Sequence, residues 1–267
     1  MMAEKHLNVK LLVATHKRYP MPDDQTLYIP VQVGCDEVTE RLGYRCDNTG
    51  DNISYKHRWY SDISSLYWGW KNLDYDYLGS LQYRRYFVSN KKKKCSNKKF
   101  EYILSREEVE ALLEKCPVIV SKKRNYYIET NESQYIHAHN KKDLDLCRTV
   151  IGEICPEYLS NFNAVMSRTW LHINNAFIMD KEHLNQFCTW LFSILFEIEK
   201  RTDLDAYDVY QGRVLGYLSE RLLDTWLEFN HVEYQEVRLA LLENPHIVAK
   251  GINFLKRKFI RSARPFN

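Results

Sequence analysis

The 267-residue sequence has no long hydrophobic run and no paired cysteines. No stretch approaches the roughly 18 uncharged apolar residues that a membrane-spanning helix needs, and residues 1–10 lack the apolar core of a signal peptide. The seven cysteines are an odd number without paired spacing or a C-x-x-C motif, which argues against a disulfide framework and a Cys/His metal site. We therefore expect a reduced, cytoplasmic protein.

Strong net charge is also lacking, because 38 Lys and Arg residues oppose 35 Asp and Glu residues and leave a formal charge of +3. A charge this small does not by itself indicate a nucleic-acid partner. Hydrophobic residues make up 45% of the chain and charged residues 27%, as in globular rather than disordered proteins. The aromatic content of 13%, with 19 Tyr and 6 Trp, suits proteins that stack sugars and bases, but a core consumes aromatic residues equally well.

The most informative stretch is 75–87, Y-D-Y-L-G-S-L-Q-Y-R-R-Y-F. Its apolar run predicts a buried strand that leads into Gln82, Tyr83, Arg84 and Arg85. Two adjacent arginines are poor core residues, because a buried guanidinium needs a partner. In open α/β sheets, ligands bind just past the carboxyl ends of strands, and the planar fork of arginine suits phosphate oxygens. The stretch therefore predicts either a diphosphate site or an edge strand whose arginines pair with surface carboxylates.

Two polar segments hold further candidates for binding a donor: Thr15, His16 and Lys17 directly after a predicted strand at 9–14, and Asp51 and Asn52 in a turn-rich loop before a predicted helix at 61–72. Hydroxyl, imidazole and carboxylate groups can bond a base, a ribose or a sugar, and a lysine can meet a phosphate. The alternative is that the first segment is a solvated loop and that the second supplies only turn chemistry.

A series of motifs resembles, in the same order, the capsular and O-antigen polysaccharide glycosyltransferase family, which was long catalogued only as a domain of unknown function. The motifs are A-T-H-K at 14–17, D-N-x-G-D-N-I-S at 47–54, Y-W-x-W-K-N at 67–72, L-G-x-x-x-Y-R-R-Y-F at 78–87, N-N-x-F-I-M at 174–179 and R-V-x-G-Y-L-S-E-R-L at 213–222. The resemblance covers about residues 7–230. It implies galactofuranosyl transfer from UDP-galactofuranose to a lipid-linked oligosaccharide.

One position departs from the family pattern. The family usually has His where this chain has Gln82. If that position touches the sugar or the acceptor, the specificity of this protein differs. A donor such as UDP-galactopyranose or UDP-glucose therefore stays open, and so does a non-catalytic, nucleotide- or glycan-binding partner of a polysaccharide synthase.

The resemblance also implies an α/β fold related to the nucleotide-sugar (GT-A) transferases. We expect a single domain over 1–245, with a mixed, mostly parallel central sheet and a helical C-terminal part. Such transferases usually hold a divalent metal with Asp-x-Asp at the end of a central strand, but here the Asp74–Asp76 motif precedes the strand. We therefore predict no metal or other cofactor, with Arg84 and Arg85 replacing the cation, and with Mn²⁺ or Mg²⁺ as the alternative.

Inverting transfer by single displacement needs a carboxylate that deprotonates the acceptor hydroxyl. In related folds this base lies after the late strand, near the start of a helix, which makes Asp208 the candidate and Asp205 the reserve. An acid at a helix N-terminus is equally ordinary dipole chemistry. Asn174 and Asn175 stand at the entrance of a predicted strand at 172–179, and in the resemblance they border the sugar site.

The acceptor side is predicted from a polar, aromatic segment at 124–139, which we interpret as a loop. Tyr135 and His139 are its candidate residues, together with Gln82 at the strand end. Glu220, inside a predicted helix, either belongs to the same sugar or acceptor site or instead holds a neighbouring arginine.

Two basic segments predict contact with a membrane surface. The lysine-rich loop 90–99 suits anionic lipid headgroups, at about 1 kcal/mol per lysine, although nucleic acid or plain solvation are alternatives. The tail 246–267 mixes apolar and basic residues at helical spacing and suits an anionic membrane surface. We expect a peripheral protein at the inner face of the plasma membrane, with a UDP-sugar and a lipid-linked acceptor as partners and without nucleic acid.

Overall fold

The computed structural model describes residues 7–90 and 100–242. Most of the predicted lysine-rich loop 90–99, the predicted tail 246–267 and the predicted domain boundary at 245 lie outside these residues. The described strands are β1 Val9–Thr15, β2 Tyr28–Gln32, β3 Arg45–Cys46, β4 Tyr77–Gln82, β5 Arg85–Phe87, β6 Val118–Ser121, β7 Arg124–Asn125, β8 Trp170–Leu171, β9 Phe177–Asp180, β10 Gln235–Val237 and β11 Leu239–Leu241.

The described α-helices are α1 His57–Tyr60, α2 Ile63–Asn72, α3 Arg106–Leu113, α4 Asn131–Ala138, α5 Lys141–Ile154, α6 Leu159–Ser167, α7 Lys181–Lys200 and α8 Val214–Phe229. Short 3₁₀ turns occupy Ser54–Lys56, Pro156–Tyr158, Leu204–Ala206 and Gln211–Arg213. Side-chain caps fix the starts of two helices. Ser105 and Glu108 form a capping box on α3, and the Asp180 carboxylate accepts the His183 N–H at the start of α7.

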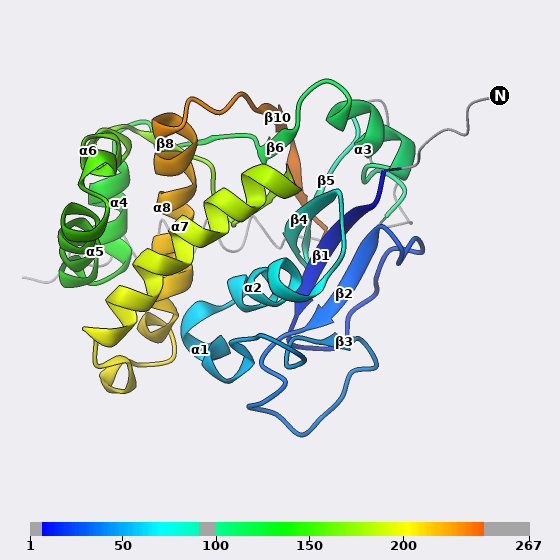
Figure 1. Ribbon diagram of the computed structural model, residues 1–267, viewed down its shortest axis with the longest axis horizontal. Coiled ribbons are helices and arrows are strands. Elements are labelled where there is room, and N and C mark those ends of the chain that lie inside the picture. The colour runs from blue at the N-terminus through cyan, green and yellow to red at the C-terminus, as the bar shows by residue number, and fades with distance from the viewer. Residues whose placement is uncertain (1–6, 91–99, 243–267) are drawn as a thin grey trace, which may run out of the picture.

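A nine-stranded sheet forms the centre of the described chain, in the order β10-β6-β9-β4-β1-β2-β3, with β5 beside β4 and β11 beside β5 (Figure 1). β1, β2, β3 and β4 are parallel, and β6 and β10 run in the same direction because β9 pairs antiparallel with both β4 and β6. The mixed, mostly parallel sheet that the sequence predicts is therefore confirmed. The carboxyl ends of these six strands lie along one edge.

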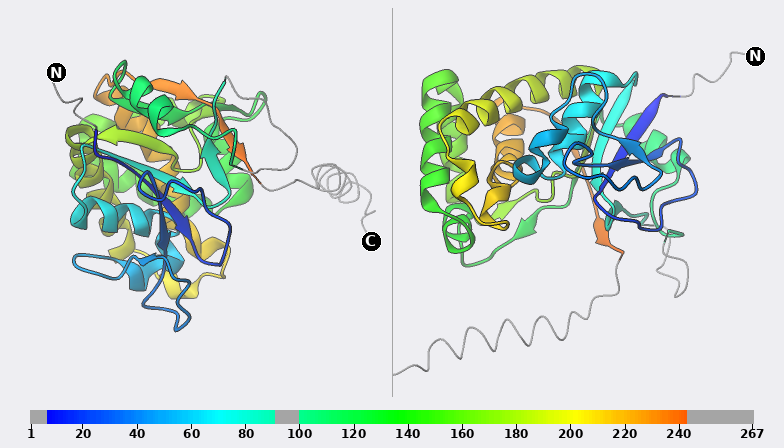
Figure 2. Two further views of the ribbon diagram at one scale, coloured as in Figure 1. Left: turned by 90° about the vertical axis from the view of Figure 1, so that its right-hand side faces the viewer. Right: turned by 90° about the horizontal axis from the view of Figure 1, so that it is seen from below.

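Alternation along β1 divides the core into two layers. Leu12 packs into a large cluster with residues of α2, α5, α6, α7 and α8, whereas Leu11 and Val13 pack on the opposite face with residues of α3 and β5. A parallel strand that is covered on both faces reads as a continuous apolar run. Figures 1 and 2 show the helices from α4 to α8 gathered beside the sheet, which agrees with the predicted helical C-terminal part.

Two predicted segments differ from the structure. The predicted loop 124–139 contains a short strand and the helix α4. The predicted strand 172–179 starts only at Phe177, because Asn174 and Asn175 have φ angles of 73° and 48°. Asparagine tolerates this left-handed region better than most residues. The two asparagines therefore form a turn at the edge of the sheet instead of the entrance of a strand.

Candidate active site

A cavity of about 470 Å³ opens at the carboxyl ends of β1 and β4. Its walls come from the segments after these strands, from α1 and from the segment 204–213. The charged and aromatic residues that line it are His16, Glu37, His57, Arg58, Trp59, Asp62, Tyr83, Arg84, Asp205, Tyr207, Asp208 and Arg213. Ligands of open α/β sheets bind at this edge, so the cavity is the candidate active site.

The segment after β1 reaches the cavity, as the sequence predicts. Its side chains differ in what they contact. The Thr15 hydroxyl is buried and donates to the Lys17 carbonyl at 2.7 Å, so it stabilises the turn. His16 lines the cavity and meets the Tyr83 ring edge-on, with the ring centroids 5.5 Å apart. The pKa of His16 is lowered by burial and by the nearby charges of Lys17, Arg213 and Arg84. This part of the cavity is therefore positively charged.

The two adjacent arginines at the end of β4 point to different sites. Tyr83 and Arg84 form the turn between β4 and β5, and both line the cavity. The Arg84 guanidinium lies 5.2 Å from the centre of the Tyr83 ring, and Lys17 Nζ lies 5.3 Å from it. Arg85 begins β5 and lines a neighbouring groove instead. The predicted arginine pair therefore divides, and only Arg84 lines the cavity.

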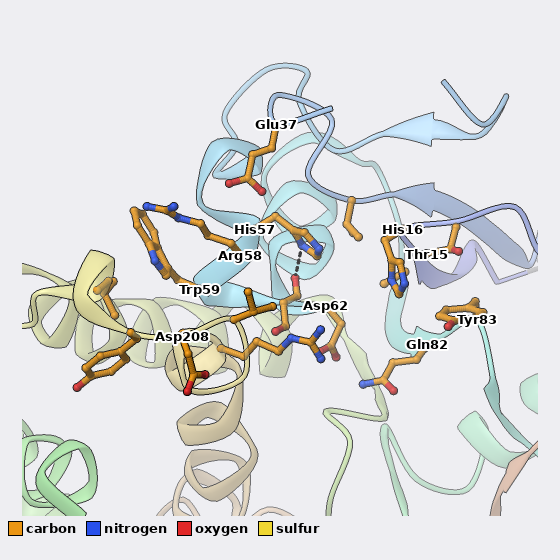
Figure 3. Close-up of a pocket in the computed structure, with 18 of the residues that line it drawn as sticks. Thr15, His16, Glu37, His57, Arg58, Trp59, Asp62, Gln82, Tyr83 and Asp208 are labelled. Carbon is orange, nitrogen blue, oxygen red and sulfur yellow. Dashed lines mark hydrogen bonds between the residues drawn. The ribbon is translucent and has the colours of Figure 1, made fainter. Parts of the chain in front are cut away.

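Asp62 is a cavity carboxylate that sequence reasoning missed. The predicted helix 61–72 corresponds to α2, which starts at Ile63. Ser61, which has a φ of 53°, separates it from the short helix α1, which the sequence did not predict. Gly216 of α8 permits this corner to pack closely, because a Cβ there would lie 3.0 Å from the Ser61 Cβ. Figure 3 shows Asp62 between His57 and Gln82, with Asp208 on the opposite side of the cavity from His16 and Tyr83.

The surroundings of Asp62 favour its protonated form. Burial raises the pKa of its carboxyl, while the amides of Gln82 and Asn175 and the charge of Arg85 act in the opposite direction. Its Oδ2 atom is buried and has no hydrogen-bond partner among the described residues. A buried carboxylate of this kind is more basic than an ordinary aspartate, and Asp62 lines the cavity.

A buried polar connection links the cavity to the groove. Arg85 donates a hydrogen bond to the Gln82 side-chain oxygen, and its charge attracts Glu220. Glu220 accepts the Asn174 N–H at 3.1 Å and pairs with Arg221 at 3.2 Å, and burial raises the pKa of its carboxyl. Glu220 therefore holds Arg221, and its predicted role toward the sugar or the acceptor stays a prediction.

The other predicted asparagine of the turn also packs on α8. Asn175 accepts a hydrogen bond from the Ser219 hydroxyl at 3.0 Å. Only 4% of its surface is exposed. The Asn174–Asn175 turn therefore forms part of the wall between the two sites.

The predicted bases Asp205 and Asp208 both line the cavity, and both have partners. Asp205 is exposed and forms an ion pair with Arg58, whose guanidinium stacks on Trp59 at 4.3 Å. The Asp208 Oδ1 accepts the N–H groups of Tyr210 and Gln211 at 2.8 Å each. These bonds stabilise the turn that contains Asp208, whereas the alternative that the sequence left open was helix-dipole chemistry.

Two predicted pairs lie away from the cavity. Asp51 accepts a hydrogen bond from the Tyr67 hydroxyl at 3.0 Å, and Asn52 bonds within its own loop. Tyr135 is fully buried in α4 and packs against His139 and Arg221. Burial, followed by the charge of Arg221, lowers the pKa of His139 to about 4. None of these four residues lines the cavity.

The Asp74–Asp76 motif lies at the amino end of β4, on the opposite edge of the sheet from the cavity. The Asp76 carboxylate accepts the Asn8 N–H at 2.9 Å, and Asp74 lies 3.8 Å from Lys181. The predicted position of the motif before the strand is confirmed. In the part of the chain that the structure describes, no group of three or more His, Cys, Asp or Glu residues is arranged to hold a metal ion.

The family model of a domain of unknown function, DUF4422, matches residues 10–231. The chain belongs to the DUF4422 family. A solved structure titled as the apo form of the WbbM bifunctional glycosyltransferase superposes with a TM-score of 0.82 at 24% identity. The match covers 89% of this chain and 46% of that one, so this DUF4422 protein spans less than half of the WbbM chain. The likeness confirms the α/β fold. No curated protein matches the chain.

The sequence assigned no role to several cavity residues of this DUF4422 protein. His57, Arg58, Trp59 and Asp62 lie at the corner between α1 and α2, and the sequence predicted a helix only from residue 61 onward. The polar run before α2 was the available signal for these residues.

No helix among residues 7–90 and 100–242 is long and apolar enough to cross a bilayer.

Proposed function

We propose that this protein is a glycosyltransferase of polysaccharide synthesis, which moves a hexose from a UDP donor to a hydroxyl of a lipid-linked oligosaccharide. The cavity carries the proposal, because cations, aromatic rings and a buried carboxylate meet there at the carboxyl edge of the sheet. The DUF4422 match and the likeness to WbbM support the same class. Galactofuranose is our first choice of sugar, from the sequence resemblance, and galactopyranose or glucose is the alternative.

The donor diphosphate suits the positively charged side of the cavity. Arg84 and Arg213 both line it, and both lower the pKa of His16. Guanidinium groups bind phosphate oxygens through charge-assisted hydrogen bonds and stabilise the charge that develops on a leaving diphosphate. Tyr83 and Trp59 offer ring faces for a base or a sugar. We propose that these arginines serve in place of a metal ion.

In the proposed displacement, the acceptor hydroxyl oxygen forms a bond to the anomeric carbon of the sugar. The bond from that carbon to the UDP oxygen breaks, and UDP leaves with the electron pair. The hydroxyl proton passes to a carboxylate. Asp62 is the better base, because burial raises the pKa of its carboxyl. Asp208, the sequence candidate, is the alternative, although two backbone N–H groups already occupy one of its oxygens.

The test is calorimetric binding of UDP with Mn²⁺ and with EDTA, followed by hydrolysis and transfer assays with UDP-sugars. We expect UDP to bind under both conditions and one UDP-hexose to be turned over. A protein that binds no UDP under either condition is not a UDP-sugar transferase. Cosedimentation with vesicles then tests the proposed peripheral location at the membrane, which rests on the tail 246–267.

A further inference from the structure

A second concave site of about 250 Å³ lies beside the cavity, on the same edge of the sheet. It is lined by residues 121–124 after β6, by 173–174 before β9, by 238–241 around β11, and by Arg85. We call this site the basic groove. The sequence suggested no ligand site at 121–123 or 238–241, and Arg124 only begins the segment 124–139 that it assigned to the acceptor. The cavity chemistry does not use these residues.

The charges on the walls of the basic groove have one sign. Its cationic residues are Arg85, Lys122, Lys123, Arg124 and Arg238, and none of its described lining residues is acidic. Lys123 has a loose ion pair with Glu236, at 3.9 Å. Across residues 7–90 and 100–242, Lys122, Arg124 and Arg238 form no ion pair with a carboxylate. Such a cluster attracts anions, since carboxylates of the described residues act only on Lys123 and Arg85.

The size and donors of the groove suit a phosphate group. A volume of about 250 Å³ is too small for a folded segment of a partner protein and matches a small anion. Arginine presents a planar fork to phosphate oxygens, and lysine adds a mobile point charge. Arg85 is half-buried, so part of the site is held in place by the fold.

The groove and the cavity share a wall. Arg85 of the groove donates to Gln82, which lines the cavity. Asn174 of the groove is held through its N–H by Glu220, on α8. A single ligand that lies along this edge of the sheet can therefore reach both sites. Its anionic end would lie in the basic groove, away from Asp62, and its other end would lie in the cavity.

We propose that the basic groove binds a phosphate or diphosphate group of the acceptor while the reacting hydroxyl of the acceptor enters the cavity. This inference rests on the proposed function for the assignment of the ligand to the acceptor. The phosphate belongs either to a lipid headgroup or to a soluble phosphorylated glycan. In both cases the groove and the donor site are two separate anion sites.

Calorimetry with pyrophosphate tests the groove. We expect two sites per chain in the wild type, of which UDP displaces one. The groove variant combines Lys122→Gln, Arg124→Gln and Arg238→Gln, all at exposed positions. It should lose the site that UDP does not displace, or bind it about tenfold or more weakly, and keep the other. The matched control, Arg41→Gln with Lys115→Gln and Lys200→Gln, removes the same charge from exposed positions elsewhere and should keep both sites.

Vesicles distinguish the two sources of phosphate. If the phosphate is a lipid headgroup, the wild type and the control variant will cosediment with phosphatidylglycerol vesicles more than the groove variant does. If the source is soluble, the three proteins will cosediment equally and only pyrophosphate binding will differ. Thermal unfolding of each variant verifies that it is folded.

Two results would overturn the inference. One is a groove variant that keeps the UDP-insensitive pyrophosphate site, or a wild type that has no such site. The other is an oligonucleotide that binds the groove more tightly than pyrophosphate, which would assign the groove to nucleic acid. Failure of the proposed function looks different: UDP would displace no pyrophosphate, yet the groove variant would still lose its site.

Discussion

The cavity and the basic groove lie along one edge of the same sheet, but their charges are arranged differently. In the cavity, Glu37, Asp62, Asp205 and Asp208 stand among the cations, and Arg58 already pairs with Asp205. In the groove, the described lining residues are cationic or uncharged. A site with charges of both signs can orient a ligand and move a proton, whereas a site with only positive charges mainly attracts and binds anions.

The boundary between the two regions falls inside one dipeptide. Arg84 lies in the turn after β4 and faces the cavity, and Arg85 starts β5 and faces the groove. The two residues line different sites because Arg84 lies in the turn between the antiparallel strands β4 and β5, whereas Arg85 already belongs to β5. We therefore predict that single substitutions along this edge of the sheet affect sugar transfer, donor binding and anion binding separately.

The largest effect is expected from Asp62→Asn. If Asp62 is the base, transfer should fall by roughly 10²–10⁴-fold, while the affinity for UDP changes little. Asp208→Asn is the matched variant on the other side of the cavity, and it should lower transfer only a few-fold, because Asp208 mainly stabilises a turn. Steady-state transfer rates measure both. The reverse order of effects would make Asp208 the base.

Thermal unfolding is the control for this pair. A carboxyl whose pKa is raised in the folded protein costs stability as the pH rises above the ordinary aspartate pKa, because the unfolded chain gives up the proton more easily, and the loss is complete above the folded pKa. Asp62→Asn should therefore be as stable as the wild type, or more stable, at neutral pH. A variant that loses both activity and stability would argue for a structural role of Asp62.

The second-largest effect is expected to distinguish Arg84 from Arg85. Arg84→Ala should weaken UDP binding by roughly 10- to 100-fold, because hydrogen bonds to charged groups contribute about 1.5–3 kcal/mol. Arg85→Ala should change the affinity for UDP much less, since Arg85 lines the groove. Calorimetry with Mn²⁺ and with EDTA measures both variants. A strict Mn²⁺ requirement, or equal losses in the two variants, would contradict the division of the arginine pair.

The pH dependence of transfer sharpens the assignment of the base. Burial raises the pKa of Asp62, so the reactive carboxylate is lost at a higher pH than for an ordinary aspartate. Transfer by the wild type should fall about tenfold per pH unit below that pKa. The residual transfer of Asp62→Asn should lack this acidic limb. A limb that persists in Asp62→Asn but disappears in Asp208→Asn would assign the titration to Asp208.

Local sequence patterns predicted the strands well and the site only in part. The apolar runs of β1, β4 and β6 were clear, and the carboxyl edge of the sheet followed from their direction. The short helix α1 and the corner after it at Ser61 were hidden, because this corner packs closely against Gly216 of α8. The basic groove was hidden too, since it joins segments more than a hundred residues apart. Long-range packing, which no local pattern encodes, assembled both features.

The smallest effect is expected at Tyr135, which the sequence assigned to the acceptor. The ring is fully buried in α4, and the hydroxyl has no hydrogen-bond partner among the described residues. Burying a hydroxyl without a partner costs free energy, so Tyr135→Phe should leave stability unchanged or raise it, and should leave transfer unchanged. Thermal unfolding and transfer rates measure the variant. A clear loss of transfer without loss of stability would instead connect α4 to the acceptor, and the cavity would then extend beyond the walls described above.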